Sequence, residues 1–428
     1  MVVDAKSLAR DLLSRHAKPA LEPVHRPRGR GLDDHPEIRA ALELRGRATA
    51  AFSDRGLPNP FFLPHTGVNG ATTGMLDGEV VNFSGYNYLG LAGDPRVTSA
   101  AKQAIDGYGT SASASRAVAG EIPLYADLER RLAGAYGAGD AVITASGYLT
   151  NAGVIPFLLG PGDLAACDAL VHSSIVSGTR WAGCRRATFA HNDPEALDRL
   201  LIRSRGSFGR VLVVVEGAYS MDGDVARLPE LIAVARKHDC LIMVDEAHSF
   251  GVLGGQGFGV REHFGLAADA VDLWMGTLSK SLASCGGFLA GDAELIAAIK
   301  TLAQGVSLFS AAPTPAQIAA AIAAFDVMVA EPQRLARLHG NAATMSTALH
   351  DGGWDTGLSA GTAIIPVILG AEERAMATSG RLLAAGIYAA PLGYPSVAEG
   401  AARIRLFMSA EHTAEHIDQL VTVLAGER

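Results

Sequence analysis

The strongest constraint on the fold is an alternation of apolar runs with helical patterns between residues 81 and 325. The clearest runs cover residues 140–144, 211–215, 241–244 and 271–275, and each has the length of a strand. Near-continuous apolar strands separated by helices are typical of a parallel sheet that is buried on both faces. The pattern therefore predicts an α/β fold whose large domain, residues 81–325, holds a mostly parallel sheet.

The two ends of the chain show other patterns. Residues 1–80 contain segments with proline and glycine around two possible helices, which indicates an N-terminal arm. Residues 326–428 combine a long helical pattern with shorter apolar runs, which predicts a smaller C-terminal α/β domain. The expected helices in these two ends cover residues 9–16, residues 36–51 and a last segment from His412, and the expected strands cover residues 363–369 and 403–408.

Composition excludes several classes of protein. Hydrophobic residues make up 49% of the chain and charged residues 19%, which excludes a largely disordered chain. The 36 basic and 44 acidic side chains leave a net charge of −8, and this charge repels nucleic acid. The sequence starts without a leader pattern, and no apolar stretch is long enough to cross a membrane. We therefore expect a globular cytoplasmic protein that does not bind nucleic acid and has no membrane span.

The cysteines and one basic segment are less informative. Four cysteines are spread along the chain without a CxxC pair, so we expect a reducing compartment and no metal site. The basic segment 25–30 is either a solvated surface or a binding site for an anionic partner. The glycine-rich segment 255–259 lacks the spacing of a nucleotide-binding loop, and we interpret it as a connecting loop.

Polar residues that follow the predicted strands are the candidates for chemistry, because ligands bind beyond the carboxyl ends of parallel strands. Lys280 follows the run 271–275 among small residues and is either an exposed lysine or a Schiff-base nucleophile. Asp245 directly follows the run 241–244, and a buried carboxylate there needs a cationic partner. The partner could be a protonated pyridine nitrogen, a basic side chain in a structural salt bridge, or a metal ion bound together with His248. Residues 145–151 open a helix after a strand and could bind a phosphate with backbone N–H groups.

These strand ends occur in the order found in pyridoxal-phosphate enzymes of the aspartate-aminotransferase-like fold, fold type I. More narrowly, the sequence resembles the α-oxoamine synthases, and among them serine palmitoyltransferase and members associated with polyketide synthesis. The resemblance covers the chain from Val81 to Val423. It is carried by residues 82–90, 115–120, 168–174, 191–193 and 216–224, by the segments around Asp245 and Lys280, and by residues 402–405.

The resemblance implies pyridoxal 5′-phosphate as the cofactor and gives the matching residues catalytic roles. Lys280 would form the internal aldimine and would move the proton at the substrate Cα. Asp245 would keep the pyridine nitrogen protonated, and His172 would stack on the ring. His248 and Ser220 resemble the residues at the phenolic oxygen of the ring.

The same resemblance implies residues that bind the phosphate and the substrate. Asn87 and Arg405 resemble the pair that holds the amino-acid carboxylate, and Ser115 would border the amino-acid side chain. Ser310 would reach in from the other subunit, so the resemblance also implies a homodimer with shared active sites. The expected phosphate ligands are Gly147, Tyr148, Thr277 and Ser310.

The implied activity is a decarboxylative condensation of an amino acid with an acyl thioester, which gives an α-amino ketone and carbon dioxide. The thioester could be an acyl-CoA or an acyl carrier protein, which the arginines of the N-terminal arm could dock. An aminotransferase or a lyase of the same fold would need the same lysine and aspartate. A non-catalytic subunit would not need to retain Lys280, Asp245, His172 and His248.

Overall fold

The computed structural model describes residues 35–75 and 78–426. The chain divides into two compact units, residues 1–50 and 51–428. In the first unit the described residues belong to helix α2, which runs from Pro36 to Ser53 and has Pro36 and Glu37 in its first turn. Proline and an acidic residue favour a helix start, and this confirms the helix expected over residues 36–51. The helix expected over residues 9–16 lies outside the described residues.

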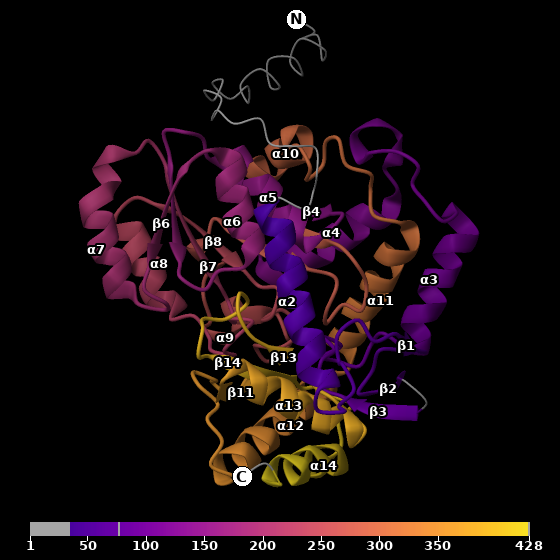
Figure 1. The fold of residues 1–428 in the computed structure, drawn as a ribbon. Coiled ribbons are helices and arrows are strands. Elements are labelled where there is room, and N and C mark those ends of the chain that lie inside the picture. Colours follow the sequence, from indigo (N-terminus) through magenta and orange to yellow (C-terminus); the bar gives the residue numbers. More distant parts are fainter. Residues whose placement is uncertain (1–34, 76–77, 427–428) are drawn as a thin grey trace, which may run out of the picture. The chain divides into compact units, whose positions relative to one another are not determined.

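A seven-stranded sheet is the centre of the second unit (Figure 1). Its strand order is β4-β10-β9-β8-β7-β5-β6. Strand β10 pairs antiparallel with both neighbours, and every other strand runs in one direction. The strands are β4 (Asp140–Thr144), β5 (Leu164–Asp168), β6 (Arg185–Phe189), β7 (Val211–Glu216), β8 (Leu241–Asp245), β9 (Leu273–Thr277) and β10 (Gly287–Gly291). The carboxyl ends of six strands therefore meet at one edge of the sheet.

Both faces of this sheet are buried, as the apolar runs predict. Successive residues of β8 belong to two different hydrophobic clusters: Ile242 and Val244 pack in one cluster and Met243 packs in the other. Residues alternate between the faces of a strand, so a strand covered on both faces is apolar throughout. The helices of this part of the chain are α3 (Pro95–Tyr108), α4 (Pro123–Tyr136), α5 (Gly147–Leu158), α6 (Ser173–Ala182), α7 (Pro194–Ser204), α8 (Leu228–Lys237), α9 (Gly259–His263), α10 (Ala293–Leu302) and α11 (Pro315–Ala330).

The four predicted strands agree with the structure to within two residues at each end, and the largest difference is at β9. Strand β9 begins at Leu273, two residues after the start of the run 271–275. The carboxylate of Asp272 accepts the backbone N–H of Ile242 at 2.7 Å, so a side chain replaces the ladder bond at that position. Strands β5, β6 and β10 are additional to the four clearest runs. Residues 255–258 of the segment 255–259 form the expected loop, and Gly259 begins α9. Glu262 accepts two backbone N–H groups of this loop.

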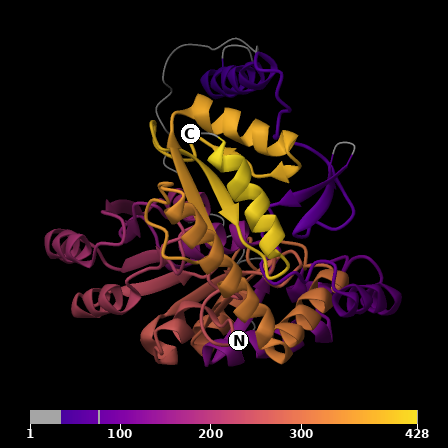
Figure 2. The same cartoon turned by 90° about the horizontal axis from the view of Figure 1, so that it is seen from below.

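The C-terminal part of the chain forms its own helices and small sheets (Figures 1 and 2). Helices α12 (Pro332–Asp351), α13 (Glu372–Ala384) and α14 (Ala414–Ala425) pack near strands β11 (Ile364–Gly370), β13 (Pro391–Leu392) and β14 (Ala402–Phe407). These strands form an antiparallel sheet in the order β11-β14-β13, which confirms the strands expected at 363–369 and 403–408. The long helical pattern is two helices, because Glu331 and Pro332 separate α11 from α12.

Strands of the expected N-terminal arm pair with the C-terminal part. The four-stranded sheet β1-β2-β3-β12 contains β1 (His65–Thr66), β2 (Thr72–Met75), β3 (Gly78–Asn82) and β12 (Ile387–Tyr388). The expected boundary between residues 80 and 81 lies inside β3, and the boundary between residues 325 and 326 lies inside α11. The domain limits stay a prediction. In the part of the chain that the structure describes, no helix is long and apolar enough to cross a membrane.

Candidate active site

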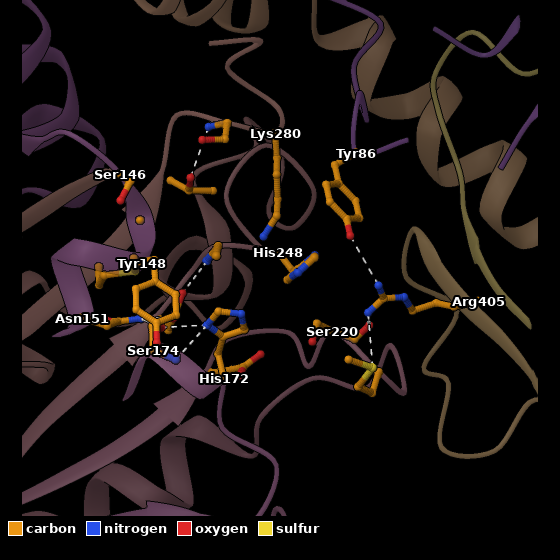
Figure 3. Close-up of a pocket in the computed structure, with 18 residues that line it drawn as sticks. Tyr86, Ser146, Tyr148, Asn151, His172, Ser174, Ser220, His248, Lys280 and Arg405 are labelled. Carbon is orange, nitrogen blue, oxygen red and sulfur yellow. Dashed lines mark hydrogen bonds between the residues drawn. The ribbon is translucent and has the colours of Figure 1, made fainter. Parts of the chain in front are cut away.

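A cavity of about 340 Å³ lies at the carboxyl ends of the central strands (Figure 3). It receives residues that follow β4, β5, β7, β8 and β9, and also Tyr86 and Arg405 from elsewhere in the chain. Nine of the predicted site residues line this cavity: Gly147, Tyr148, His172, Ser220, Asp245, His248, Thr277, Lys280 and Arg405. The fold therefore brings together predicted site residues that are up to 258 positions apart in the chain, from Gly147 after β4 to Arg405 on β14.

The N-terminus of α5 forms one wall of the cavity. Ser146 caps the helix by accepting the backbone N–H of Leu149 at 3.2 Å. No hydrogen-bond partner for the backbone N–H groups of Gly147 and Tyr148 occurs among the described residues. A Cβ atom at Gly147 would lie 3.2 Å from the Thr277 hydroxyl oxygen, so glycine allows the helix to approach strand β9 closely. Free N–H groups and the helix dipole make this end of α5 suitable for a phosphate.

Asp245 lies deeper in the cavity at the end of β8. Its carboxylate accepts hydrogen bonds from the Asn151 side chain at 2.7 Å and from the Ala247 backbone at 2.9 Å. Glu216 is opposite Asp245 in the register of β7 and β8. Burial and the Asp245 charge raise the pKa of Glu216 well above its usual range. Two carboxyl groups, Asp245 and Glu216, therefore lie side by side at the carboxyl ends of β8 and β7.

Lys280 directs its amine into the cavity beside His248 (Figure 3). Burial lowers the pKa of Lys280 to about 8, although the charges of Asp245 and Glu216 act in the opposite direction. A lysine with this pKa has about a tenth of its amine in the reactive neutral form at pH 7, far more than an exposed lysine has. Burial and the positive charge of Lys280 lower the pKa of His248. The Nδ1 atom of His248 lies 2.8 Å from the Tyr88 hydroxyl oxygen.

His172 precedes helix α6 and forms its N-cap. Its Nδ1 atom lies 2.7 Å from the Ser174 hydroxyl, and this contact fixes the orientation of the ring. Burial lowers the pKa of His172, which favours a neutral imidazole. Ser174 also accepts the Asn151 amide at 3.0 Å, so His172 and Asp245 are joined through two shared side chains.

Two arginines of β14 have different environments. Arg403 forms a buried ion pair with Asp222 at 2.6 Å. Arg405 has no carboxylate partner among the described residues; it donates to the Ser220 carbonyl at 2.8 Å and to the Tyr86 hydroxyl at 3.4 Å. Its buried Nε atom has no partner in the described structure. Arg405 is therefore a guanidinium that can bind an incoming carboxylate.

Three predicted site residues do not line this cavity. The Asn87 side chain accepts the backbone N–H groups of Leu91 and Ala92, so its amide oxygen is used to hold the local turn. Ser115 begins the short helical turn at residues 116–120. Ser310 donates to the Ala311 carbonyl at 3.4 Å, and the resemblance assigns it to the site of another subunit.

Several lining residues were not predicted individually, although they lie in segments that the sequence pattern or the family resemblance indicated. Tyr86, Ser146, Asn151, Ser174 and Glu216 all line the cavity. Glu216 ends a buried strand as Asp245 does, and this position is the signal that could have identified it. Asn151 lies one helical turn inside α5, and only the approach of α5 to β8 makes it a partner of Asp245.

The family model for aminotransferase class I and II matches residues 78–424. An 8-amino-7-oxononanoate synthase of Geobacter sulfurreducens is 42% identical over 350 residues, which cover 81% of this chain and 88% of that protein. A serine palmitoyltransferase of Sphingobacterium spiritivorum is 37% identical over 348 residues, which cover 81% of this chain and 86% of that protein. The solved structure of a Sphingomonas wittichii serine palmitoyltransferase, 31% identical, has a TM-score of 0.86 and covers 93% of this chain and 98% of its own.

The cofactor of this family is pyridoxal 5′-phosphate, and a solved structure with a TM-score of 0.87 and 30% identity holds it as an internal aldimine. The residues of the cavity fit this group. The free N–H groups at α5 suit its phosphate, Asp245 suits a protonated ring nitrogen, and Lys280 suits its aldehyde carbon. In the described structure, two buried oxygen atoms of residues that line the cavity have no hydrogen-bond partner: Oε1 of Glu216 and the amide oxygen of Asn151. The chain belongs to the aminotransferase class I and II family, in its α-oxoamine synthase branch.

Proposed function

We propose that this protein is a pyridoxal-phosphate-dependent C-acyltransferase that condenses an amino acid with an acyl thioester. The observation that carries the proposal is the convergence of Lys280, Asp245 and the uncompensated Arg405 on one cavity. The reaction forms a bond between the amino-acid Cα and the thioester carbonyl carbon. It breaks the C–S bond and the bond between Cα and the carboxylate, and it releases a thiol and carbon dioxide.

The residues of the chain supply positioning and proton transfer. Arg405 binds the amino-acid carboxylate, and this contact orients the bonds at Cα. Lys280 accepts the Cα proton with its neutral amine and later returns a proton to the product. Pyridoxal phosphate supplies the electron sink that lets the Cα bonds break, and Asp245 keeps its ring nitrogen protonated.

A second cavity supports the use of two substrates. It has a volume of about 340 Å³ and shares Tyr86 and Arg405 with the first cavity. Its lining combines the apolar side chains of Leu63, Leu392 and Phe407 with polar side chains such as His65 and Asn69. The adjacent position and the apolar side chains suit an acyl chain whose carbonyl carbon meets the amino acid beside Arg405.

Release of labelled carbon dioxide tests the reaction. The holoenzyme is incubated with glycine, L-alanine or L-serine labelled at the carboxyl carbon, with and without acyl-CoA thioesters or an acylated carrier protein. We expect label in carbon dioxide only when amino acid and thioester are both present. Release without a thioester, or accumulation of a keto acid, would instead identify a lyase or an aminotransferase. Comparison of the two thioester types decides between acyl-CoA and carrier-protein delivery. The basic segment 25–30, which could dock a carrier protein, lies outside the described residues.

The acyl position is tested with Leu63→Trp, which fills the second cavity. We expect kcat/KM for a long acyl-CoA such as palmitoyl-CoA to fall at least tenfold, while kcat/KM for acetyl-CoA changes less than threefold. The control is Leu358→Trp, because Leu358 is 58% exposed and lines neither cavity. Equal losses with both thioesters would place the acyl chain elsewhere.

A homodimer is the proposed assembly, with Ser310 directed to the partner's site. Phe309 is 71% exposed and Val118 is 82% exposed. The two segments that carry them are joined by a hydrogen bond from the Ala312 N–H to the Ala114 carbonyl at 3.1 Å. Exposed apolar side chains on neighbouring segments favour burial against a second copy. A cytoplasmic location stays a prediction from the sequence.

A further inference from the structure

His191 belongs to a sequence motif that the catalytic assignment leaves without a role. It lies in the loop between β6 and α7 and does not line the cavity. Its Nδ1 atom lies 2.8 Å from Asp168 Oδ1, and its Nε2 atom lies 3.0 Å from Asp224 Oδ2. The exposed side-chain fractions of His191, Asp168 and Asp224 are 14%, 0% and 9%. The imidazole therefore joins two buried carboxylates, one at the end of β5 and one in the segment that follows β7.

Both contacts require a protonated ring. A neutral imidazole has one N–H group, so only the imidazolium can donate from both nitrogens to carboxylates. Burial alone would lower the pKa of His191, but its hydrogen bonds to Asp168 and Asp224 raise that pKa to about 10. The edge of the ring also packs against Tyr219, with centroids 4.4 Å apart. His191 is thus a fixed positive charge between two negative ones.

The Asp168 arm of this bridge leads to His172. Asp168 ends β5, and its carboxylate also accepts the backbone N–H groups of Leu170 and Asn192. The bond from Leu170 lies within the turn from Asp168 to His172, and the bond from Asn192 ties this turn to the loop that carries His191. Because His172 caps helix α6 directly after this turn, the position of Asp168 sets where the His172 ring enters the cavity.

The Asp224 arm leads to Ser220 and Arg405. The backbone carbonyl of Asp224 accepts the N–H of Tyr219 at 2.9 Å, and this bond closes the turn that carries Ser220. The Ser220 carbonyl accepts the Arg405 guanidinium at 2.8 Å. Asp224 is therefore connected to Arg405 through the turn that carries Ser220 and through the hydrogen bond between Ser220 and Arg405.

We propose that His191 is a positioning residue that ties the loop carrying His172 to the loop carrying Ser220 and so fixes both sides of the cavity. The Asp168 arm holds the cofactor side, and the Asp224 arm holds the carboxylate side through Arg405. The cofactor side of this proposal rests on family membership, and the carboxylate side rests on the proposed function.

Each of two conservative variants removes one of the two hydrogen bonds of the His191 ring. The asparagine amide in His191→Asn takes the place of Nδ1, so this variant keeps the bond to Asp168 and loses the bond to Asp224. The glutamine amide in His191→Gln takes the place of Nε2, so it keeps Asp224 and loses Asp168. The matched control is His238→Asn, because His238 is similarly buried and contacts a single carboxylate, Asp198, away from the cavity.

Two dissociation constants are measured for each folded variant. The first is that of pyridoxal phosphate for the apoprotein, with the circular dichroism of the bound cofactor as a measure of its orientation. The second is that of the tightest binder among glycine, L-alanine and L-serine for the holoenzyme. We expect His191→Gln to weaken cofactor binding about tenfold and to reduce the cofactor circular dichroism. We expect His191→Asn to weaken amino-acid binding about tenfold with cofactor binding changed less than threefold, since losing a charged hydrogen bond has an effect of this order.

The proposal is overturned if both variants lower only the melting temperature, as a purely structural role requires, or if both change the two constants equally. If the wild-type holoenzyme binds no amino acid, the proposed function fails while the cofactor measurements still test His191. If the variants do not fold, a measurement on the wild-type protein still tests the proposal. Protein labelled with ¹⁵N-histidine must show two ring N–H protons at pH 7 on the histidine in contact with Tyr219, and a single proton would disprove the bridge.

Discussion

The reactivity of Lys280 results from opposing effects on a single amine. Burial favours the neutral form, whereas the negative charges of Asp245 and Glu216 favour the protonated form. Burial dominates, and the pKa falls to about 8. Because the pKa of an exposed lysine is about 10.4, Lys280 differs from surface lysines in the pH range where it becomes nucleophilic.

The rate of trapping of pyridoxal by the apoprotein should therefore rise with pH and reach half of its maximum near pH 8. The neutral amine is the nucleophile, and its fraction increases as the pH passes through the pKa. Borohydride reduction followed by mass spectrometry of the Lys280 peptide measures this rate. Lys237 is the internal control, since it is an exposed lysine in a surface ion pair with Asp198. A half-maximal rate above pH 10 at Lys280 would contradict the assignment.

The close approach of helix α5 to strand β10 sets the phosphate end of the site. A Cβ atom at Gly287 would lie 2.3 Å from the Thr150 hydroxyl oxygen and 2.8 Å from the Gly147 Cα atom. The Gly147 Cα atom is backbone and cannot rotate away. Glycine at position 287 is thus required for the N-terminus of α5 to reach the cavity.

Gly287→Ala should push α5 outward, weaken pyridoxal-phosphate binding at least tenfold and lower the free energy of unfolding by about 1–3 kcal/mol, as overpacking commonly does. Fluorescence titration of the apoprotein and urea unfolding measure the two effects. Gly340→Ala serves as the control, because Gly340 is exposed on α12 and a Cβ atom there meets nothing within 4 Å. The explanation fails if Gly287→Ala binds the cofactor as tightly as the wild type does.

At the scale of the whole molecule, the proposed dimer would complete the site. Phe309 is exposed beside Ser310 and has a φ of 57°. An aspartate tolerates this backbone region better than most residues, so Phe309→Asp removes apolar surface without straining the chain. The substitution also introduces a charge that a dimer interface would bury at high cost.

Phe309→Asp should convert the dimer to a monomer at micromolar concentration and reduce the condensation rate at least tenfold. Sedimentation velocity measures the first effect and carbon dioxide release measures the second. Ile202→Asp is the matched control, because Ile202 is 65% exposed on α7. A wild-type protein that sediments as a monomer, or a dimeric Phe309→Asp variant, would refute the proposed assembly.

The sequence alone determined the central strands and the residues that end them. Asp245 and Lys280 were candidates because a buried strand is visible as an apolar run and the carboxyl ends of parallel strands share one edge. The family resemblance then gave these two residues their roles. Strands β5 and β10 were harder to identify, since alanine, cysteine and glycine in them carry little strand preference. The order of the motifs also determined the family.

The tertiary structure decided which polar groups form hydrogen bonds with each other. Asn151 supports Asp245 across 94 positions, and His191 joins Asp168 to Asp224 across 23 and 33 positions. No local pattern encodes these pairs, because a hydrogen bond depends on distance and direction in space and not on separation in the chain. For the same reason, only the structure could show that Asn87 spends its amide oxygen on a local turn, while Arg405 has no carboxylate partner among the described residues.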